Sequence, residues 1–195
     1  TVDLNGNIVT IAGGANGLVT INAGTGGIDL ASGKSITTTA ATAGTASGAI
    51  DLKSTGNVNL VGDLVTTGVA NASGAGAAGG VVTVDTTGAA TISVANITTS
   101  GGASTATHGS GGAAGGITLN TDTGVITLNS STITAAGGLG NGTGAGAGVQ
   151  GAGGYISFSD AVILAGGASA IDTGATSGNI TFSNTVNGGQ ALTLT

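Results

Sequence analysis

The feature that most restricts the fold of this chain is a short pattern that recurs along almost its whole length. In residues 117–138 the triplet Ile-Thr-Leu occurs twice, at 117–119 and 126–128, and a single apolar residue, Ile133, follows. Alternation with a period of two places Ile and Leu on one face and Thr on the other, which is typical of a half-buried β-strand. Asn, Asp, Gly and Ser separate the triplets and favour turns. The pattern therefore predicts short strands joined by tight turns.

The same unit repeats at a nearly regular interval. Its first strands begin at Val19, Ile50, Val82, Ile117, Ile156 and Ile180, which are spaced at about 24 to 39 residues, the range typical of solenoids. Second strands follow at Ile28, Val58, Ile92, Ile126 and Val162, and a third apolar position follows at Ile36, Leu64, Ile97 and Ile133. The opening triplets 2–4 and 9–11 form a partial unit, residues 165–178 are predicted to be a loop, and the triplets 180–182 and 192–194 begin a sixth unit. Only the segment after the third position varies in length.

A unit of constant cross-section with one variable segment predicts an all-β fold, a parallel β-helix (β-solenoid). Since one coil cannot bury its own apolar face, the stack is the folding unit. We expect 1–195 to be a single β-solenoid segment of about six to seven coils, each advancing by about 4.8 Å. Equivalent residues then form columns, such as Leu52, Val84, Leu119 and Phe158 inside the stack. Outward Thr and Asn columns are expected to form side-chain hydrogen-bond ladders.

The variable segments are rich in glycine and alanine. The three longest occupy residues 68–80, 101–116 and 137–154, and each ends in Gly-Gly just before the next first strand. We expect these inserts to project from one side of the solenoid, and the terminal glycines to adopt positive φ angles where the chain turns back. Their composition suits either packing close to the coil or mobility. No strict sequence period of three, the mark of polyglycine II, is visible.

The composition excludes several classes of function. Only 5% of residues are charged, and eight Asp against Lys34 and Lys53 give a formal net charge of −6. Nucleic-acid binding requires clustered Lys and Arg, so we expect no nucleic-acid partner, and attraction to anionic lipid is also disfavoured. No apolar run approaches the ~20 residues of a membrane-spanning helix. A mean hydropathy of +0.46 argues against disorder, and the absence of Cys fits an exported protein.

The chain offers few groups for catalysis. His108 is the only histidine, and it lies within a glycine-rich insert where an exposed loop residue is expected. Ser104 and Ser110 are close in sequence, but no nucleophile-elbow motif accompanies them. Paired carboxylates along a groove, which glycoside hydrolysis requires, are not visible. We predict that the protein is not an enzyme, with no catalytic, cofactor-binding or metal-binding residues and no cofactor.

Three aspartates share one pattern. Asp3, Asp29 and Asp51 each occupy the outward middle position of an apolar-Asp-Leu strand. Solvated surface carboxylates are the first interpretation, and a cation-binding pair is the alternative. The spacing places Asp29 and Asp51 on different sides of the coil, and the calcium-binding nonapeptide motif is absent. Asp122 is predicted to be a turn residue that accepts backbone N–H groups.

An array of outward Thr residues suggests an ice-binding face as an alternative function. The middle residues of the first strands are not uniform, however, since Asp and Ser interrupt the array, which reads Thr20, Asp51, Thr83, Thr118, Ser157 and Thr181. Thr is also simply a favourable residue at an exposed strand position.

Two of the units carry a family resemblance. Residues 79–102, GGVVTVDTTGAATISVANITTSGG, and 115–138, GGITLNTDTGVITLNSSTITAAGG, resemble the repeats of filamentous-haemagglutinin-type exoproteins and other giant bacterial surface adhesins. The resemblance covers almost the whole chain. It implies a right-handed β-helix that is secreted or displayed on the cell surface of a Gram-negative bacterium. The chain, which breaks off within its repeat at both ends, is then expected to be an excerpt or subunit of a longer fibre.

This resemblance implies a structural role: an extracellular fibre or adhesin stalk for surface attachment, cell–cell contact or matrix. Its expected partners are flanking β-helix coils, further copies stacked head to tail into filaments, and surface glycans or a receptor on a host or neighbouring cell. The alternative is an ice-binding or carbohydrate-binding β-helix that uses the outward Thr face or the glycine-rich inserts.

Overall fold

The described part of the chain consists of β-strands, turns and extended segments. A computed structural model describes residues 1–11, 17–142, 145–176 and 178–195, and within those ranges no helix is present. The strand pairs among the described residues are all parallel and form two sheets, one of six strands and one of eleven. No helix long and apolar enough to cross a membrane occurs in the described ranges.

The six-stranded sheet collects the first strand of every unit. Each strand pairs with its equivalent in the next unit, as in Ile50↔Val82 and Ile117↔Val82. Its strands are β3 (Val19–Ala23), β6 (Ile50–Ser54), β8 (Val82–Thr86), β10 (Ile117–Asn120), β12 (Ile156–Phe158) and β15 (Ile180–Phe182).

The eleven-stranded sheet collects the second and third strands of the units in two adjacent columns. The second-strand column begins with β1 (Val2–Leu4), β4 (Ile28–Leu30), β7 (Val58–Val65), β9 (Ile92–Thr98) and β11 (Ile126–Thr134), and ends with β13 (Val162–Ala165) and β16 (Val186–Asn187). The third-strand column contains β2 (Ile8–Val9), β5 (Ser35–Thr37), β14 (Ser169–Asp172) and β17 (Leu192–Leu194). The long strands β7, β9 and β11 take part in both columns. In the β7–β9 pair, a register shift between Leu60 and Asp63 separates the second-strand part from the third-strand part.

The chain visits these columns in the same order in every unit, from the six-stranded sheet to the second-strand column and then to the third. This succession of parallel strands agrees with the all-β, solenoid type of architecture predicted from the repeat. The predicted column of Leu52, Val84, Leu119 and Phe158 is confirmed, because these residues are partners across β6, β8, β10 and β12.

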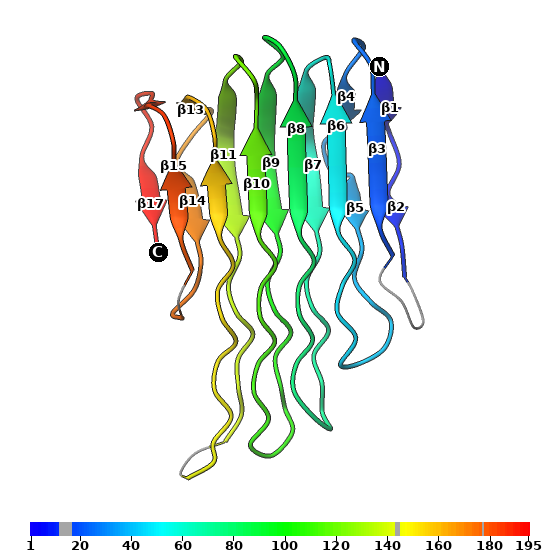
Figure 1. The fold of residues 1–195 in the computed structure, drawn as a ribbon, viewed down its shortest axis with the longest axis vertical. Helices are drawn as coiled ribbons and strands as arrows, with labels where there is room; N and C mark the ends of the chain where they lie inside the picture. Colours follow the sequence, from blue (N-terminus) through cyan, green and yellow to red (C-terminus); the bar gives the residue numbers. More distant parts are fainter. Residues whose placement is uncertain (12–16, 143–144, 177) are drawn as a thin grey trace.

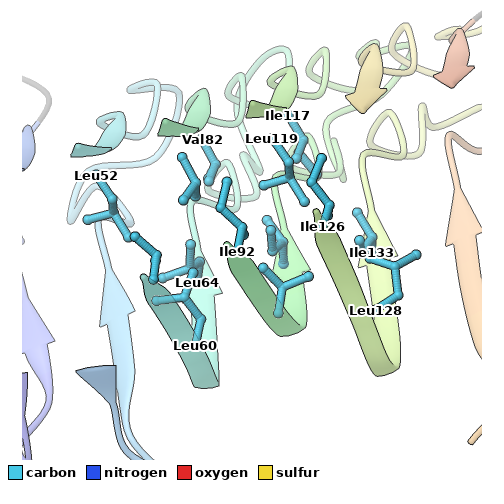
Figure 2. Close-up of a cluster of buried hydrophobic side chains, with 14 of the residues drawn as sticks. Leu52, Leu60, Leu64, Val82, Ile92, Ile117, Leu119, Ile126, Leu128 and Ile133 are labelled. Atoms are coloured by element: carbon cyan, nitrogen blue, oxygen red, sulfur yellow. The ribbon is translucent and has the colours of Figure 1, made fainter. Parts of the chain in front are cut away.

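The aliphatic side chains of the two sheets face each other and form the core. Figure 2 shows Ile117 and Leu119 of one sheet directed towards Ile126 and Ile92 of the other. Leu119, Ile92 and Ile126 are completely buried. The core continues through the stack to Phe158, whose ring stacks on that of Phe182 at a centroid distance of 4.7 Å. Burial of the apolar face of every unit against its neighbours therefore stabilises the stack.

Three strand assignments made from the sequence were wrong at the ends of the repeat. The triplet 9–11 was predicted to be a strand, but β2 ends at Val9, and Val9 and Ile11 are exposed. Residues 165–178 were predicted to be a loop, but β14 lies within them and buries Ile171 in the third-strand column. The sixth unit contains a short second strand, β16, that the sequence pattern missed, and β17 pairs with β14 in the third-strand column. In these units Ser or Val replaces the usual Ile-Thr signature, so the alternation is too short to identify.

The glycine-rich inserts leave the sheets after the third strand of each unit and extend in the same direction (Figure 1). The insert that follows β7 occupies residues 66–80, that after β9 residues 99–116 and that after β11 residues 135–154. They lengthen along the stack, and the connection that follows β14 is short again (Figure 1).

Candidate interaction surfaces: the insert slab and the outer faces

The inserts that follow β5, β7 and β9 are each closed at the base by a threonine, whereas the insert after β11 begins with Ala135, whose carbonyl accepts the Gly154 N–H at 2.8 Å. The Oγ1 hydroxyls of Thr38, Thr66 and Thr99 donate to the carbonyl oxygens of Gly48, Gly80 and Gly115 at 2.6, 2.6 and 2.7 Å. The backbone N–H of each of these glycines donates back to the carbonyl of the same threonine, at 2.8 Å for Gly80 and Gly115. All three threonines are completely buried. Sequence reasoning missed this clamp, although a threonine immediately after the third strand was a visible signal.

Beyond the clamp, the outgoing and returning arms of the long inserts form two layers. Returning arms bond to one another, as in Gly79 N–H to Ala113 O at 2.9 Å, and outgoing arms do the same, as in Gly101 N–H to Ala136 O at 2.9 Å. The layers are joined within one insert by Gly112 N–H to Gly102 O at 2.9 Å. We call this two-layered arrangement of residues 66–80, 99–116 and 135–154 the insert slab.

Neighbouring inserts are also joined across the layers. Gly102 N–H donates to Ala77 O and Gly138 N–H donates to Gly112 O, both at 2.8 Å. The arms are therefore interleaved along the stack, and each added insert completes hydrogen bonds that the previous one leaves open. The interpretation that the inserts pack close to the coil does not describe this arrangement, because the arms extend away from the sheets and bond to one another.

Hydrogen bonding along an arm has a period of three residues. In the returning arm of the β9 insert, Gly112 and Gly115 donate across the layers while Gly111 and Ala114 donate within the layer. Three residues per turn without internal hydrogen bonds is the geometry of polyproline II and polyglycine helices. The sequence shows no strict period of three, because the packing requires glycine only at positions where two arms approach closely, and other positions accept Gly or Ala.

Close approach explains the glycines. A Cβ atom at Gly112 would overlap the carbonyl oxygen of Ala77, and one at Gly115 would overlap that of Gly80. The same holds at Gly138 against Gly102. The Gly-Gly pairs that end the inserts, such as 79–80 and 115–116, do not have positive φ angles. The prediction of positive φ at these positions was wrong, and absence of a Cβ is what the packing requires.

Side chains reappear on the outer surfaces of the slab. Ala113 and Ala152 lie side by side on the exposed face of the returning layer, next to Ala78 in the adjacent insert. Val149 and Leu139, on the insert after β11, are 68% and 65% exposed. The slab sequences contain no Asp, Glu, Lys or Arg. Both broad faces are therefore neutral and carry small apolar side chains.

Outside the slab, asparagine and aspartate pair across neighbouring units. Asn59 Nδ2 donates to Asp29 Oδ1 at 2.9 Å, and Asn96 Nδ2 donates to Asp63 Oδ1 at 2.9 Å. The predicted ladders of asparagine thus exist in a mixed form, with an amide beside each carboxylate instead of a second amide. Asp122 accepts a bond from the backbone N–H of Gly88 at 3.3 Å, in the preceding unit.

The acidic pattern in the first units is resolved by the register. Asp29 and Asp51 lie in different sheets, as predicted, whereas Asp3 and Asp29 are direct partners on adjacent strands. Asp3 and Asp29 line a shallow hollow together with Asn59. Asp51 instead forms an ion pair with Lys53 at 3.1 Å. Within the described ranges, no three His, Cys, Asp or Glu side chains gather as a metal site would require.

The outer column of the six-stranded sheet has the order expected from the sequence. Thr20, Asp51, Thr83, Thr118, Ser157 and Thr181 are successive partners.

His108 is exposed at the far end of an insert, with a φ angle of 58°. Ser104 is buried nearby, and its hydroxyl donates to Gly74 O at 2.7 Å, so this hydroxyl stabilises the contact between two inserts. Ser110 lies on the returning arm, where its carbonyl accepts the Gly76 N–H.

The two ends of the stack present partly buried apolar side chains. Val2, Leu4 and Ile8 pack against the core at one end, and Ile180, Phe182 and Leu192 do so at the other.

In comparisons with protein-family models, curated proteins and solved structures, the chain has no match.

Proposed function

We propose that the chain is a segment of an extracellular structural fibre or adhesin stalk, built as a closed, right-handed β-helix of about six to seven coils. The resemblance of its repeats to filamentous-haemagglutinin-type exoproteins supports this proposal, as does the in-register stack of aliphatic columns. A secreted or cell-surface location in a Gram-negative bacterium is part of the same proposal.

The observation that carries the proposal is the character of the two ends. The outermost strands, β1 and β3 at one end and β15 and β16 at the other, each have a strand partner on one side only. Their apolar residues, including Val2 and Phe182, remain partly exposed. An unpaired parallel edge with an open apolar interior is a template for a further coil. The fitting partner is more β-helix, either flanking coils of the same chain or another copy stacked head to tail.

Electron microscopy of the native material tests this function directly. We expect thin, unbranched filaments, because the columns and the backbone hydrogen bonds continue through every junction. Isolated compact particles at all concentrations would contradict a fibre or stalk.

A pair of variants separates end-to-end stacking from general adhesion. Phe182→Asp places a charge in the apolar interior of the last unit and is expected to abolish concentration-dependent association, measured by sedimentation velocity. The matched control is Thr181→Asp, whose side chain is exposed on the outer face of the same strand. Equal association of both variants would count against stacking through the ends.

A further inference from the structure

The inserts hold a group of polar side chains at a fixed distance from the sheets. At the far end of the slab, the turns 71–74, 104–109 and 140–142 of three successive inserts meet. We call these residues the distal rim. The rim lies near the ends of the inserts that are farthest from the sheets (Figure 1).

Hydrogen bonds between inserts order the rim. Thr105 N–H donates to Asn71 O at 2.9 Å, and Asn141 N–H donates to Gly109 O at 2.9 Å. The side-chain amide of Asn141 donates to Thr105 O at 2.9 Å and to Ala106 O at 3.2 Å. Buried Ser104 donates to Gly74 O at 2.7 Å. Adjacent turns are thus tied together, and binding would not have to order them first, which lowers the entropic cost of association.

The ordered turns leave polar groups unused. The hydroxyls of Thr105 and Thr107 and the imidazole of His108 make no hydrogen bond to any described residue. All three residues are exposed, and His108 is held at a positive φ angle of 58°. A non-glycine residue in this region is uncommon and strained, and such residues gather at binding sites.

Charge restricts the class of ligand. No Asp, Glu, Lys or Arg occurs in any of the three inserts, so the rim carries no permanent charge to pair with a phosphate, a carboxylate or an ammonium. What it offers are hydroxyls, an imidazole, exposed backbone groups and the exposed apolar side chain of Leu139 beside Asn141. Neutral donors and acceptors next to an apolar surface suit a ligand with many hydroxyl groups and C–H faces.

We propose that the distal rim binds the end of a neutral oligosaccharide, through Thr105, Thr107 and His108, and that the slab serves as the rigid arm that presents it. This inference goes beyond the structural role proposed for the sheets, and it does not require that the chain form filaments.

The test measures binding of the 195-residue chain to a panel of immobilised neutral and sialylated oligosaccharides and of glycine-rich peptides. We expect binding to at least one neutral oligosaccharide. Replacing both hydroxyls in Thr105→Val/Thr107→Val is expected to weaken that binding by about tenfold, since two hydrogen bonds to the ligand are lost. His108→Asn tolerates the positive φ angle and is expected to weaken binding also.

The control is Thr118→Val, which removes an outward hydroxyl from β10, far from the rim, and is expected to bind as the parent chain does. Failure to bind any neutral oligosaccharide would overturn the proposal. So would preference for sialylated sugars or peptides, or equal loss in the rim variant and the control. Because the readout is binding by single chains, loss of filament formation in the Phe182→Asp variant should leave it unchanged, so the two proposals fail separately.

Discussion

Equivalent parts of successive units stack on one another both in the sheets and in the insert slab, but the sheets pack through large side chains and the slab packs through the absence of side chains. In the sheets, the space between opposite faces is filled by aliphatic side chains such as Leu119 and Ile126, which are completely buried. In the slab, the two layers are joined through glycines such as Gly112, where even one Cβ would overlap a carbonyl oxygen. One region is stabilised mainly by removing apolar area from water, the other by backbone hydrogen bonds and close contact.

This contrast indicates that the two regions tolerate opposite substitutions. Removing side-chain atoms should damage the sheets, and adding them should damage the slab. Because apolar burial provides more free energy per residue than a net hydrogen bond, the sheets should also unfold last. The following predictions test this difference, beginning with the largest expected effect.

Truncation in the core should have the largest effect. Leu119→Ala leaves a cavity between β10 and the facing sheet and is expected to lower the free energy of unfolding by about 2–5 kcal/mol. Chemical denaturation measures this change. The control Thr118→Ala alters the neighbouring outward position and should cost much less; a similar loss in both variants would refute the assignment of the two faces.

Addition of one methyl group should be costly in the slab. Gly112→Ala forces the interleaved arms apart and is expected to cost about 1–3 kcal/mol, as overpacking does. The loss should be local, seen as faster amide exchange in residues 101–115 with little change in the sheets. Ala113→Val, one residue away on the outer face, is the matched control and should leave exchange unchanged. If Gly112→Ala is silent, the close approach of the layers is wrong.

The threonine clamp connects the two regions and should have an intermediate effect. Thr99→Val keeps the shape of the buried side chain but leaves the Gly115 carbonyl without its hydroxyl donor, at a cost of about 1 kcal/mol. Thr98→Val, on the outward side of β9, provides the comparison. The difference between the two melting temperatures measures the hydroxyl–carbonyl bond, and no difference would show that the clamp does not stabilise the base of the insert.

The outer Thr column should contribute least to stability. Thr118→Leu and Thr83→Leu are expected to change the free energy of unfolding by less than about 0.5 kcal/mol, as usual for surface substitutions. The same two variants decide the ice-binding alternative. A structural fibre predicts no thermal hysteresis in the parent chain, whereas hysteresis that disappears in these variants would favour an ice-binding face.

The sheets could be predicted from the sequence because their signal is local. Alternation of Ile with Thr is enough to identify most strands and the register of the Leu52–Val84–Leu119 column. It failed at β14 and β16, where the alternation is too short. The slab was not predictable in this way. Gly112 faces a neighbouring insert and Ala113 faces outward, and this difference depends on contacts with other inserts that are distant in sequence.

Amide hydrogen exchange along the returning arms, measured residue by residue by NMR, tests the central claim that the inserts form an ordered two-layer slab. In residues 111–116 the account predicts two protected amides followed by one unprotected. Gly111, Gly112, Ala114 and Gly115 donate to backbone carbonyls, while Ala113 and Gly116 donate to no acceptor in the described part of the chain. Exchange of all these amides at the rate of an unfolded chain would contradict it.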